Sequence, residues 1–170
     1  MLNEFSLYKL SYGMYIAASG DAQAANAQIC NTAFQITSDP KIVAVSINKQ
    51  NYTHELIKKT GRLSLSILDT SATFELIGKF GFRSGRNEDK LGGVAQKPGA
   101  TGVPIVLESA CAYIECEVSG EADMGTHTLF FGKVVEGEIL TDATPMTYDY
   151  YHSVIKGKAP KTAPTFIEGA

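Results

Sequence analysis

A polar segment at residues 48–53 (N-K-Q-N-Y-T) has the composition of an anion site. It follows an alternating strand pattern and precedes an amphipathic helix pattern, so the first N–H groups of that helix have no partner within the helix. These groups and the positive end of the helix dipole favour a phosphate. Asn48, Asn51 and Thr53 can add side-chain donors. Lys49 adds a positive charge. The alternative is that Asn51 and Thr53 only cap the helix.

Two further side chains could contact a ligand. His127 stands where a predicted turn enters a strand, and an imidazole there can donate to a cofactor carbonyl or stack on a nicotinamide ring. The alternative is an ordinary histidine at a strand end. Lys90 lies in a charged loop, and its ammonium group could reach a carbonyl or phosphate oxygen of a ligand. The alternative for this loop is a solvated turn.

Metal binding, thiol catalysis and two common phosphate sites have no support. Cys111 and Cys116 are five residues apart on one predicted strand, so they point to opposite faces of the sheet. Cys30 has no histidine or cysteine at ligand spacing, and we predict no metal ion. The sequence has neither G-x-G-x-x-G after a strand nor G-x-x-x-x-G-K-[ST], which excludes a Rossmann site and a P-loop.

Period-two alternation is the dominant pattern of the chain. In residues 41–48 (KIVAVSIN), the apolar positions alternate with small and polar ones. Short turns that contain Gly, Asp and Pro separate such segments, which is typical of an antiparallel barrel or sandwich. The six predicted strands are residues 11–18, 27–37, 41–48, 62–68, 105–124 and 127–140.

Two helices interrupt these strands, at residues 51–59 and 71–80. Residues 83–102 are rich in glycine and charge and predict a long loop, a kind of segment that is usually functional or mobile. We expect one domain over residues 1–155, followed by an extended C-terminal tail over residues 156–170 that contains two prolines, Pro160 and Pro164.

The composition excludes several partners. The net charge is −3 and the fifteen Lys and Arg residues form no basic stripe, so we expect no nucleic-acid partner. No apolar run is long enough to span a bilayer, so we expect no membrane association. The N-terminus lacks a secretory signal, and three irregularly spaced cysteines make no disulfide framework. These features predict a reducing, cytoplasmic location.

Several segments together carry a family resemblance. Residues 26–40 (NAQICNTAFQITSDP), then VAVSINKQNYTHELI, SGRNEDKL, GTHTLFFGKVV and YYHSVIKGKAPKTAPT occur in one order along nearly the whole chain. In this order they resemble the flavin reductase-like family of FMN-binding split barrels. They are most similar to the flavin domain of high-molecular-weight rubredoxins and to flavoredoxins. The resemblance implies a mainly β fold: a six-stranded antiparallel Greek-key split barrel with a few flanking helices.

The resemblance also implies roles for individual residues, and it favours the ligand interpretation of residues 48–53 and of His127. His127 is the predicted catalytic residue, next to the nicotinamide, and Lys90 is expected beside the flavin. One group is expected along the flavin ring: Asn26, Gln28, Ile29, Cys30, Asn31, Thr32 and Ala33. A second group is expected around the ribityl phosphate: Ser46, Asn48, Lys49, Asn51, Tyr52 and Thr53.

The implied function is an NAD(P)H-dependent flavin reductase. Bound FMN would accept a hydride from NADH or NADPH and pass electrons onward. High-molecular-weight rubredoxins continue from the A-P-T segment into a rubredoxin domain with two C-x-x-C pairs, which are absent from this sequence. The acceptor is therefore expected to be free flavin or a separate protein such as a rubredoxin, a flavodiiron protein or a ferredoxin. A homodimer is implied as well. The alternative function is a non-enzymatic FMN electron carrier between separate redox proteins.

Overall fold

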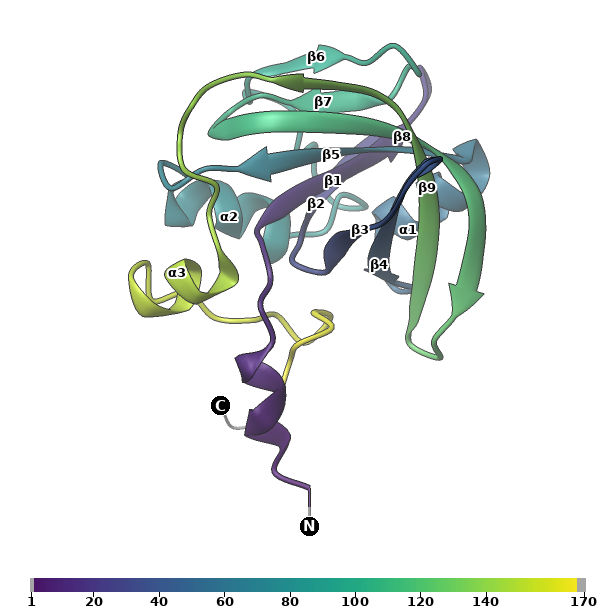
Figure 1. The fold of residues 1–170 in the computed structure, drawn as a ribbon. Helices are drawn as coiled ribbons and strands as arrows, with labels where there is room; N and C mark the ends of the chain where they lie inside the picture. The colour runs from purple at the N-terminus through teal and green to yellow at the C-terminus, as the bar shows by residue number, and fades with distance from the viewer. Residues whose placement is uncertain (1, 168–170) are drawn as a thin grey trace.

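The computed structural model describes residues 2–167, and one antiparallel sheet dominates it (Figure 1). Seven strands form this sheet in the order β2-β1-β5-β8-β9-β4-β3. They are β1 (Tyr15–Gly20), β2 (Ala25–Cys30), β3 (Ala33–Ser38), β4 (Lys41–Asn48), β5 (Arg62–Leu68), β8 (Ala110–Asp123) and β9 (His127–Ile139). Two short strands, β6 (Gln96–Pro98) and β7 (Pro104–Val106), pair with each other. The helices are the 3-10 helix η1 (Glu4–Lys9) and α1 (Tyr52–Thr60), α2 (Phe74–Gly81) and α3 (Tyr148–Ser153).

The sheet is rolled into an open barrel with a seam at residues 31–32. The strands β2 and β3 follow each other in the chain, yet they form the two opposite edges of the sheet. The twist of neighbouring strands accumulates until the end of β2 lies beside β4, where Sγ of Cys30 faces the carbonyl of Ser46 at 3.8 Å. The predicted split barrel is thus confirmed. The strand count is seven rather than six, because the predicted strand 27–37 breaks at Asn31.

Other element boundaries differ from the predictions for local reasons. The predicted strand 105–124 divides into β7 and β8, because Ser109 has a left-handed backbone with φ 53° and cannot continue a ladder. The helix α2 begins later than predicted, after Thr73, whose hydroxyl accepts a hydrogen bond from the N–H of Leu76. The predicted loop 83–102 contains the short β6. The helix α3 was not predicted, because its six residues are too few to show helical periodicity.

Two apolar cores lie on the two faces of the rolled sheet. One core fills the barrel below α1 and includes Ile47, Ile57 and Phe130. The other lies under α2 and α3 and includes Met14 and Phe80. The alternation of apolar residues in each strand supplies both cores. Because β2 contributes to both, its side chains lie where the two cores meet.

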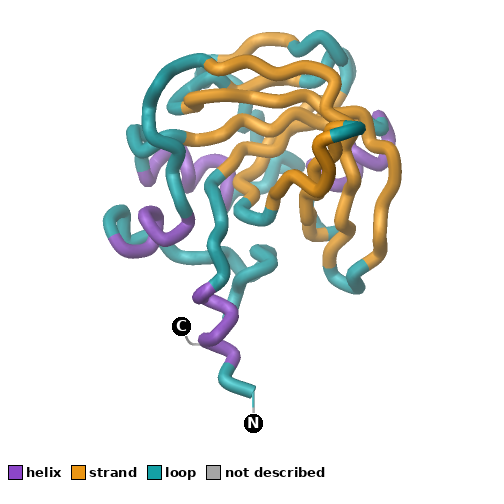
Figure 2. The backbone as a smooth tube through the Cα atoms, viewed as in Figure 1, coloured by secondary structure: helices purple, strands orange, loops and turns teal. Residues whose placement is uncertain are grey.

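The C-terminal segment, residues 156–167, crosses the open side of the barrel (Figures 1 and 2). It has no helix or strand but is fixed at its start. The Tyr151 hydroxyl donates to the carbonyl of Lys158 at 3.0 Å, and a ring nitrogen of His152 lies 2.9 Å from the carbonyl of Gly157. A Cβ at Gly157 would lie 1.9 Å from the Tyr151 ring, so only glycine allows this approach. Among residues 2–167, no helix has the length and apolar character needed to cross a bilayer.

Candidate functional site

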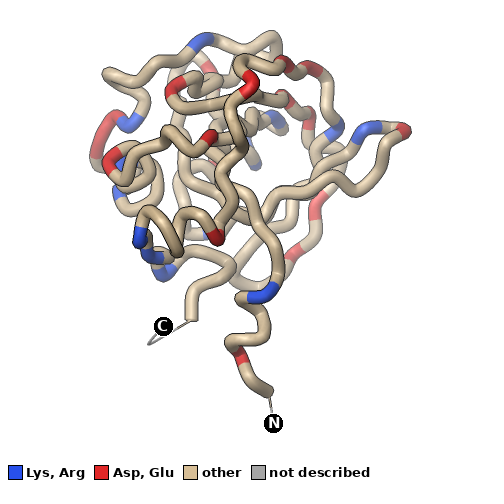
Figure 3. The backbone as a smooth tube through the Cα atoms, turned by 60° about the vertical axis from the view of Figure 1, so that its left-hand side comes forward, with Lys and Arg blue, Asp and Glu red and all other residues tan. Residues whose placement is uncertain are grey.

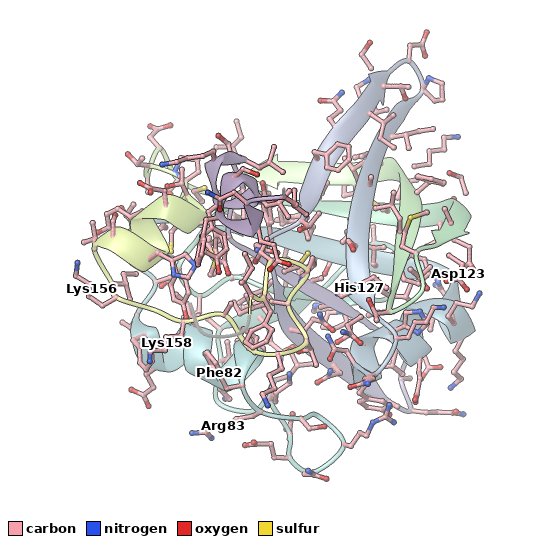
Figure 4. All side chains as sticks on the ribbon, turned by 90° about the horizontal axis from the view of Figure 1, so that it is seen from below. Phe82, Arg83, Asp123, His127, Lys156 and Lys158 are labelled. Atoms are coloured by element: carbon pink, nitrogen blue, oxygen red, sulfur yellow. The ribbon has the colours of Figure 1, made fainter. Side chains whose placement is uncertain are left out.

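A cavity of about 660 Å³ opens at the seam of the barrel, a volume typical of cofactor sites. The strand β2 and the end of β4 form its floor. The start of α1, the end of α2 and the C-terminal segment form its walls. Figure 4 shows this side of the molecule, with the C-terminal segment running from Lys158 toward His127.

The start of α1 borders the cavity without a side-chain cap. Asn51 occupies the N-cap position, and its side chain makes no capping hydrogen bond. Both Asn51 and Tyr52 line the cavity. The alternative in which Asn51 only caps the helix is therefore not the arrangement in the structure. Its amide is available to a ligand, beside the positive end of the helix dipole.

A buried hydrogen bond fixes the start of α1 to β2. The Asn26 amide donates to the Thr53 hydroxyl at 2.9 Å, and both side chains are buried. The loop after α2 closes over this pair: a Cβ at Gly85 would lie only 2.0 Å from Oδ1 of Asn26. Asn26 lines the cavity, whereas Thr53 lies behind it. Thr53 therefore positions the helix and the asparagine, and it does not itself border the cavity.

Gln28 presents a hydrogen-bond acceptor without a partner. Its side chain is 8% exposed and lines the cavity, and within residues 2–167 its buried Oε1 accepts no hydrogen bond. A buried acceptor left unpaired costs on the order of 1–3 kcal/mol. A ligand N–H directed at this oxygen would remove that cost. The isoalloxazine ring of a flavin carries such an N–H, so the wall at Gln28 fits the predicted ring position.

Lys90 is a buried cation in the cavity wall. Its side chain is 3% exposed, and Nζ donates to the carbonyls of Phe80 and Arg83 at 3.3 and 3.2 Å. These carbonyls belong to the end of α2 and the residues after it. Burial lowers the pKa of Lys90 to about 8, against the opposing attraction of Glu88. The ammonium is therefore still charged at neutral pH, next to whatever the cavity binds.

Cys30 contributes a neutral thiol to the cavity wall. Burial raises the pKa of Cys30 to about 12, so its thiolate form is negligible near neutral pH. Its Sγ faces the carbonyls of Thr32 and Ser46 at 3.5 and 3.8 Å. Cys30 therefore acts as a small apolar wall residue and supplies no nucleophile.

Side chains of the site hold the C-terminal segment over the cavity. The Asn31 amide donates to the Thr165 hydroxyl at 2.8 Å, and that hydroxyl donates to the Tyr148 hydroxyl at 3.0 Å. The Asn48 amide donates to the carbonyl of Thr162 at 3.2 Å. We call residues 158–166 the strap, because they line the cavity from outside.

His127 contacts the strap and does not line the cavity. Its Nε2 donates to the Thr162 carbonyl at 3.2 Å, and its Nδ1 lies 2.9 Å from the Thr126 hydroxyl. Partial burial lowers the pKa of His127, and the bond to Thr162 only partly opposes this effect. At neutral pH His127 is therefore a neutral imidazole that holds the strap.

The structure brings most of the predicted site residues into one wall. The predicted residues that line the cavity are Asn26, Gln28, Ile29, Cys30, Asn31, Ser46, Asn51, Tyr52 and Lys90. Thr53 contacts Asn26 from behind, whereas Asn48 and His127 contact the strap at Thr162. Lys49 lies elsewhere, in an ion pair with Asp123 at 2.6 Å. The Thr32 hydroxyl donates to the Asn31 side chain at 3.1 Å, and Ala33 begins β3.

Sequence reasoning missed three parts of the wall. These are the end of α2 with the following loop, the aromatic residues of α3, and the strap; their lining residues are Ile77, Phe80, Gly81, Phe82, Arg83, Ser84, Gly85, Tyr148, Tyr151, Lys158, Ala159, Pro160, Lys161, Thr162, Ala163, Pro164 and Phe166. The prolines of the strap indicated an extended segment but not its position. Only long-range contacts place it over the seam.

The chain is similar to known proteins over most of its length. The family model described as "Flavin reductase like domain" matches residues 7–157. A ferric-chelate reductase (NAD(P)H) from Archaeoglobus fulgidus is 46% identical over 163 residues, 96% of this chain and 96% of that protein. A high molecular weight rubredoxin from Moorella thermoacetica is 45% identical over 164 residues, 96% of this chain and 72% of that protein.

A solved structure supports the same assignment. The crystal structure of an FMN-binding protein from Thermus thermophilus, with bound 1-cyclohex-2-enone, matches with a TM-score of 0.71 and 28% identity, over 78% of this chain and 72% of that chain. The predicted family and the predicted enzyme class, an oxidoreductase of the flavin reductase kind, are thereby confirmed. The match in sequence covers most of the chain, and the split-barrel architecture agrees with it. This chain belongs to the flavin reductase-like family.

Proposed function

We propose that this protein is an FMN-containing oxidoreductase that takes a hydride from NADH or NADPH and passes the electrons to a flavin or an electron-transfer protein. The observation that carries the proposal is the cavity wall. It combines an unpaired buried acceptor at Gln28 with an uncapped helix start at Asn51. These two groups suit a ring N–H and a phosphate, the two polar features that FMN combines in one molecule.

The relatives support the same cofactor and donor. A relative in Archaeoglobus fulgidus is named a ferric-chelate reductase that uses NAD(P)H, and a structural relative is named an FMN-binding protein. When bound, FMN supplies the redox chemistry, because its ring accepts a hydride and can release electrons one or two at a time. The protein supplies orientation, charge and exclusion of water.

Each part of the wall has a defined task in this proposal. The N–H groups at the start of α1 and the Asn51 amide bind the phosphate. Gln28 and the backbone of β2 orient the ring. Lys90, charged at neutral pH, stabilises negative charge that develops on the ring during reduction. His127 acts through the strap, which it holds at Thr162, and so positions the nicotinamide indirectly.

Anaerobic titration of the FMN-loaded protein with NADH and with NADPH tests the proposal. We expect the visible flavin band to bleach at a rate that saturates with nicotinamide concentration. Reduction by dithionite is the control that shows the flavin to be redox-active. If dithionite bleaches the flavin and neither nicotinamide does so, the protein is a non-enzymatic electron carrier and the proposed enzyme activity is wrong.

We also propose that two copies of the chain form a homodimer. The edge strand β3 has no buried residue, and it exposes Phe34 and Ile36 to 55% and 46%. The helix η1 likewise buries none of its residues and exposes Phe5, Leu7 and Tyr8. Apolar surface of this kind on a small domain marks an interaction site. A second copy of the chain is the proposed occupant.

A further inference from the structure

A second, open groove lies beside the cavity, between the outer face of α2 and the start of the C-terminal segment. Its lining residues are Phe74, Glu75, Gly78, Lys79, Phe82, Arg83, Lys156 and Lys158. We call it the α2 groove. Phe82, Arg83 and Lys158 also line the cavity. Figure 4 shows these residues near Lys156 on one side of the molecule. The α2 groove therefore borders the rim of the proposed flavin site.

The α2 groove is positively charged although the whole chain is negative. Four of its lining residues are cations and one, Glu75, is an anion, whereas the chain carries a net charge of −3. Figure 3 shows Lys and Arg positions grouped on this side, near the C-terminal segment. The positive charge of the α2 groove therefore comes from where the fold places these residues, and not from the composition of the chain.

The cations of the α2 groove are also mostly free of acidic partners. Arg83 pairs with Glu88 at 3.3 Å, and Lys79 donates to a backbone carbonyl, that of Gly92, at 2.7 Å. Within residues 2–167, neither Lys156 nor Lys158 has a carboxylate within ion-pair distance, whereas several lysines elsewhere are paired. Unpaired cations leave an unbalanced positive potential at this surface.

The backbone holds these two lysines in place. Gly157 lies between them, and its N–H donates to the carbonyl of Tyr151 at 3.0 Å. Lys156 has a left-handed backbone with φ 60°, a conformation that costs a lysine roughly 1 kcal/mol. The packing of Gly157 on the Tyr151 ring compensates for this cost. The two charges therefore project from a fixed turn and not from a loose tail.

Apolar surface accompanies the charge. Phe74 and Phe82 are 55% and 48% exposed, and both line the α2 groove. Exposed aromatic rings surrounded by charged side chains are typical of a protein interface, where the rings are buried and the charges select and steer the partner. A site for a nucleotide phosphate would instead gather buried donors, and Lys156 and Lys158 are exposed.

We infer that the α2 groove is the docking surface for an acidic protein that carries single electrons. The inference rests on the proposed function, since that function supplies the electrons at the neighbouring cavity. One NAD(P)H delivers a hydride, which carries two electrons. Two oxidised carrier molecules then dock in turn and each takes one electron, so that NAD(P)⁺, one proton and two reduced carriers result. Electrostatic attraction between the acidic carrier and the groove speeds each encounter.

A charge-reversal experiment on the FMN-loaded protein tests this inference, with a rubredoxin of negative net charge as the carrier. The test variant is the double substitution Lys79→Glu and Lys156→Glu, because these lysines line the α2 groove and not the cavity. The control is Lys133→Glu, an exposed lysine on β9 without a carboxylate partner in the described part of the chain. The readouts are the second-order rate of carrier reduction at several salt concentrations and the rate of flavin bleaching by NADH.

At low salt we expect the double variant to reduce the carrier at least about 10-fold more slowly than the wild type does, and its rate should depend less on salt concentration. The rate of flavin bleaching by NADH should be unchanged. The control should behave as wild type. A double variant that reduces the carrier at the wild-type rate overturns the inference. A double variant with a raised KM for NADH or NADPH and an unchanged rate of carrier reduction also overturns the inference, because the groove would then bind nucleotide phosphates. If NADH bleaches no flavin, the proposed function fails, and the same comparison after reduction with dithionite still tests the docking surface.

Discussion

Two side chains of the cavity wall offer opposite chemistry to a ligand. Gln28 presents an unpaired acceptor, whereas Asn51 and the adjacent start of α1 present donors. This difference allows the two contacts to be separated by experiment. FMN and riboflavin share the ring, but only FMN carries the phosphate. A residue that binds the phosphate therefore distinguishes the two molecules, and a residue that binds the ring does not.

We predict that Asn51→Ala weakens FMN binding roughly 10-fold and leaves riboflavin binding unchanged, because it removes one hydrogen bond to a charged group. The thermal stability of the Asn51→Ala variant should hardly change, since the Asn51 side chain makes no capping hydrogen bond. Gln28→Leu should weaken the binding of both molecules. Quenching of flavin fluorescence measures both affinities, and Gln23→Leu, on an exposed turn, is the control. Equal losses for FMN and riboflavin with Asn51→Ala would mean that the phosphate lies elsewhere.

The buried ammonium of Lys90 should make stability depend on pH. Its pKa is about 8 in the folded protein and 10.5 in the unfolded chain. Between these values the unfolded chain binds more protons, so stability rises with pH in that window. Below pH 8 the full cost of burying the charge is present. Relative to a Lys90→Met variant, the wild type should gain roughly 3 kcal/mol between pH 8 and pH 10.5. Urea unfolding across this range measures the gain, and parallel curves for both proteins would contradict it.

At the scale of the elements, the strap decides access to the cavity. Its hydrogen bonds come from three predicted site residues: Asn31 at the seam after β2, Asn48 at the end of β4 and His127 at the start of β9. Asn31, Asn48 and His127 thus contribute to the site by holding a covering segment. A ligand that enters or leaves the cavity on this side must displace the strap or pass beside it.

We predict that Thr165→Val increases the dissociation rate of FMN about 3- to 10-fold. The substitution removes the hydrogen bonds that Thr165 makes with Asn31 and Tyr148, and a net loss of about 1 kcal/mol per hydrogen bond loosens the strap. Release of FMN into an excess of apoflavodoxin, followed by fluorescence, measures the rate. Thr144→Val is the matched control, because Thr144 is exposed and outside the strap. An unchanged dissociation rate would show that the strap does not limit release.

At the scale of the whole molecule, the exposed face of β3 is the surface that we propose for the homodimer. An edge strand with exposed apolar side chains invites pairing with another chain unless it is covered. We predict that Phe34→Ser combined with Ile36→Ser converts a dimer into a monomer, as measured by light scattering during gel filtration. Phe74→Ser is the control, since Phe74 is as exposed as Phe34 but lies on α2. A monomeric wild type, or a double variant that stays dimeric, would exclude this face as the interface.

Local patterns determined much of this protein. The alternation of residues 41–48 and 62–68 predicted β4 and β5 at their observed bounds, because half-buried strands expose alternate side chains to different surroundings. Gly61 ends α1 with the left-handed backbone, φ 65°, that a helix stop requires. Five segments in family order identified the flavin reductase-like fold. Most of the site residues that they predicted line the cavity, because β2 and the start of α1 supply consecutive residues to it.

Tertiary structure decided the rest. The chain breaks at Asn31, so that β2 and β3 form opposite edges of the sheet. The position of this break depends on how far the whole sheet rolls. The strap lies over the seam because side chains more than one hundred residues away bind it, such as Asn31 to Thr165. A tertiary contact also turns His127 toward the carbonyl of Thr162. The turn that packs on Tyr151 places Lys156 next to α2. Periodicity and capping report only on neighbours in the chain, so the sequence determined the elements and the family, and packing determined what covers the cavity.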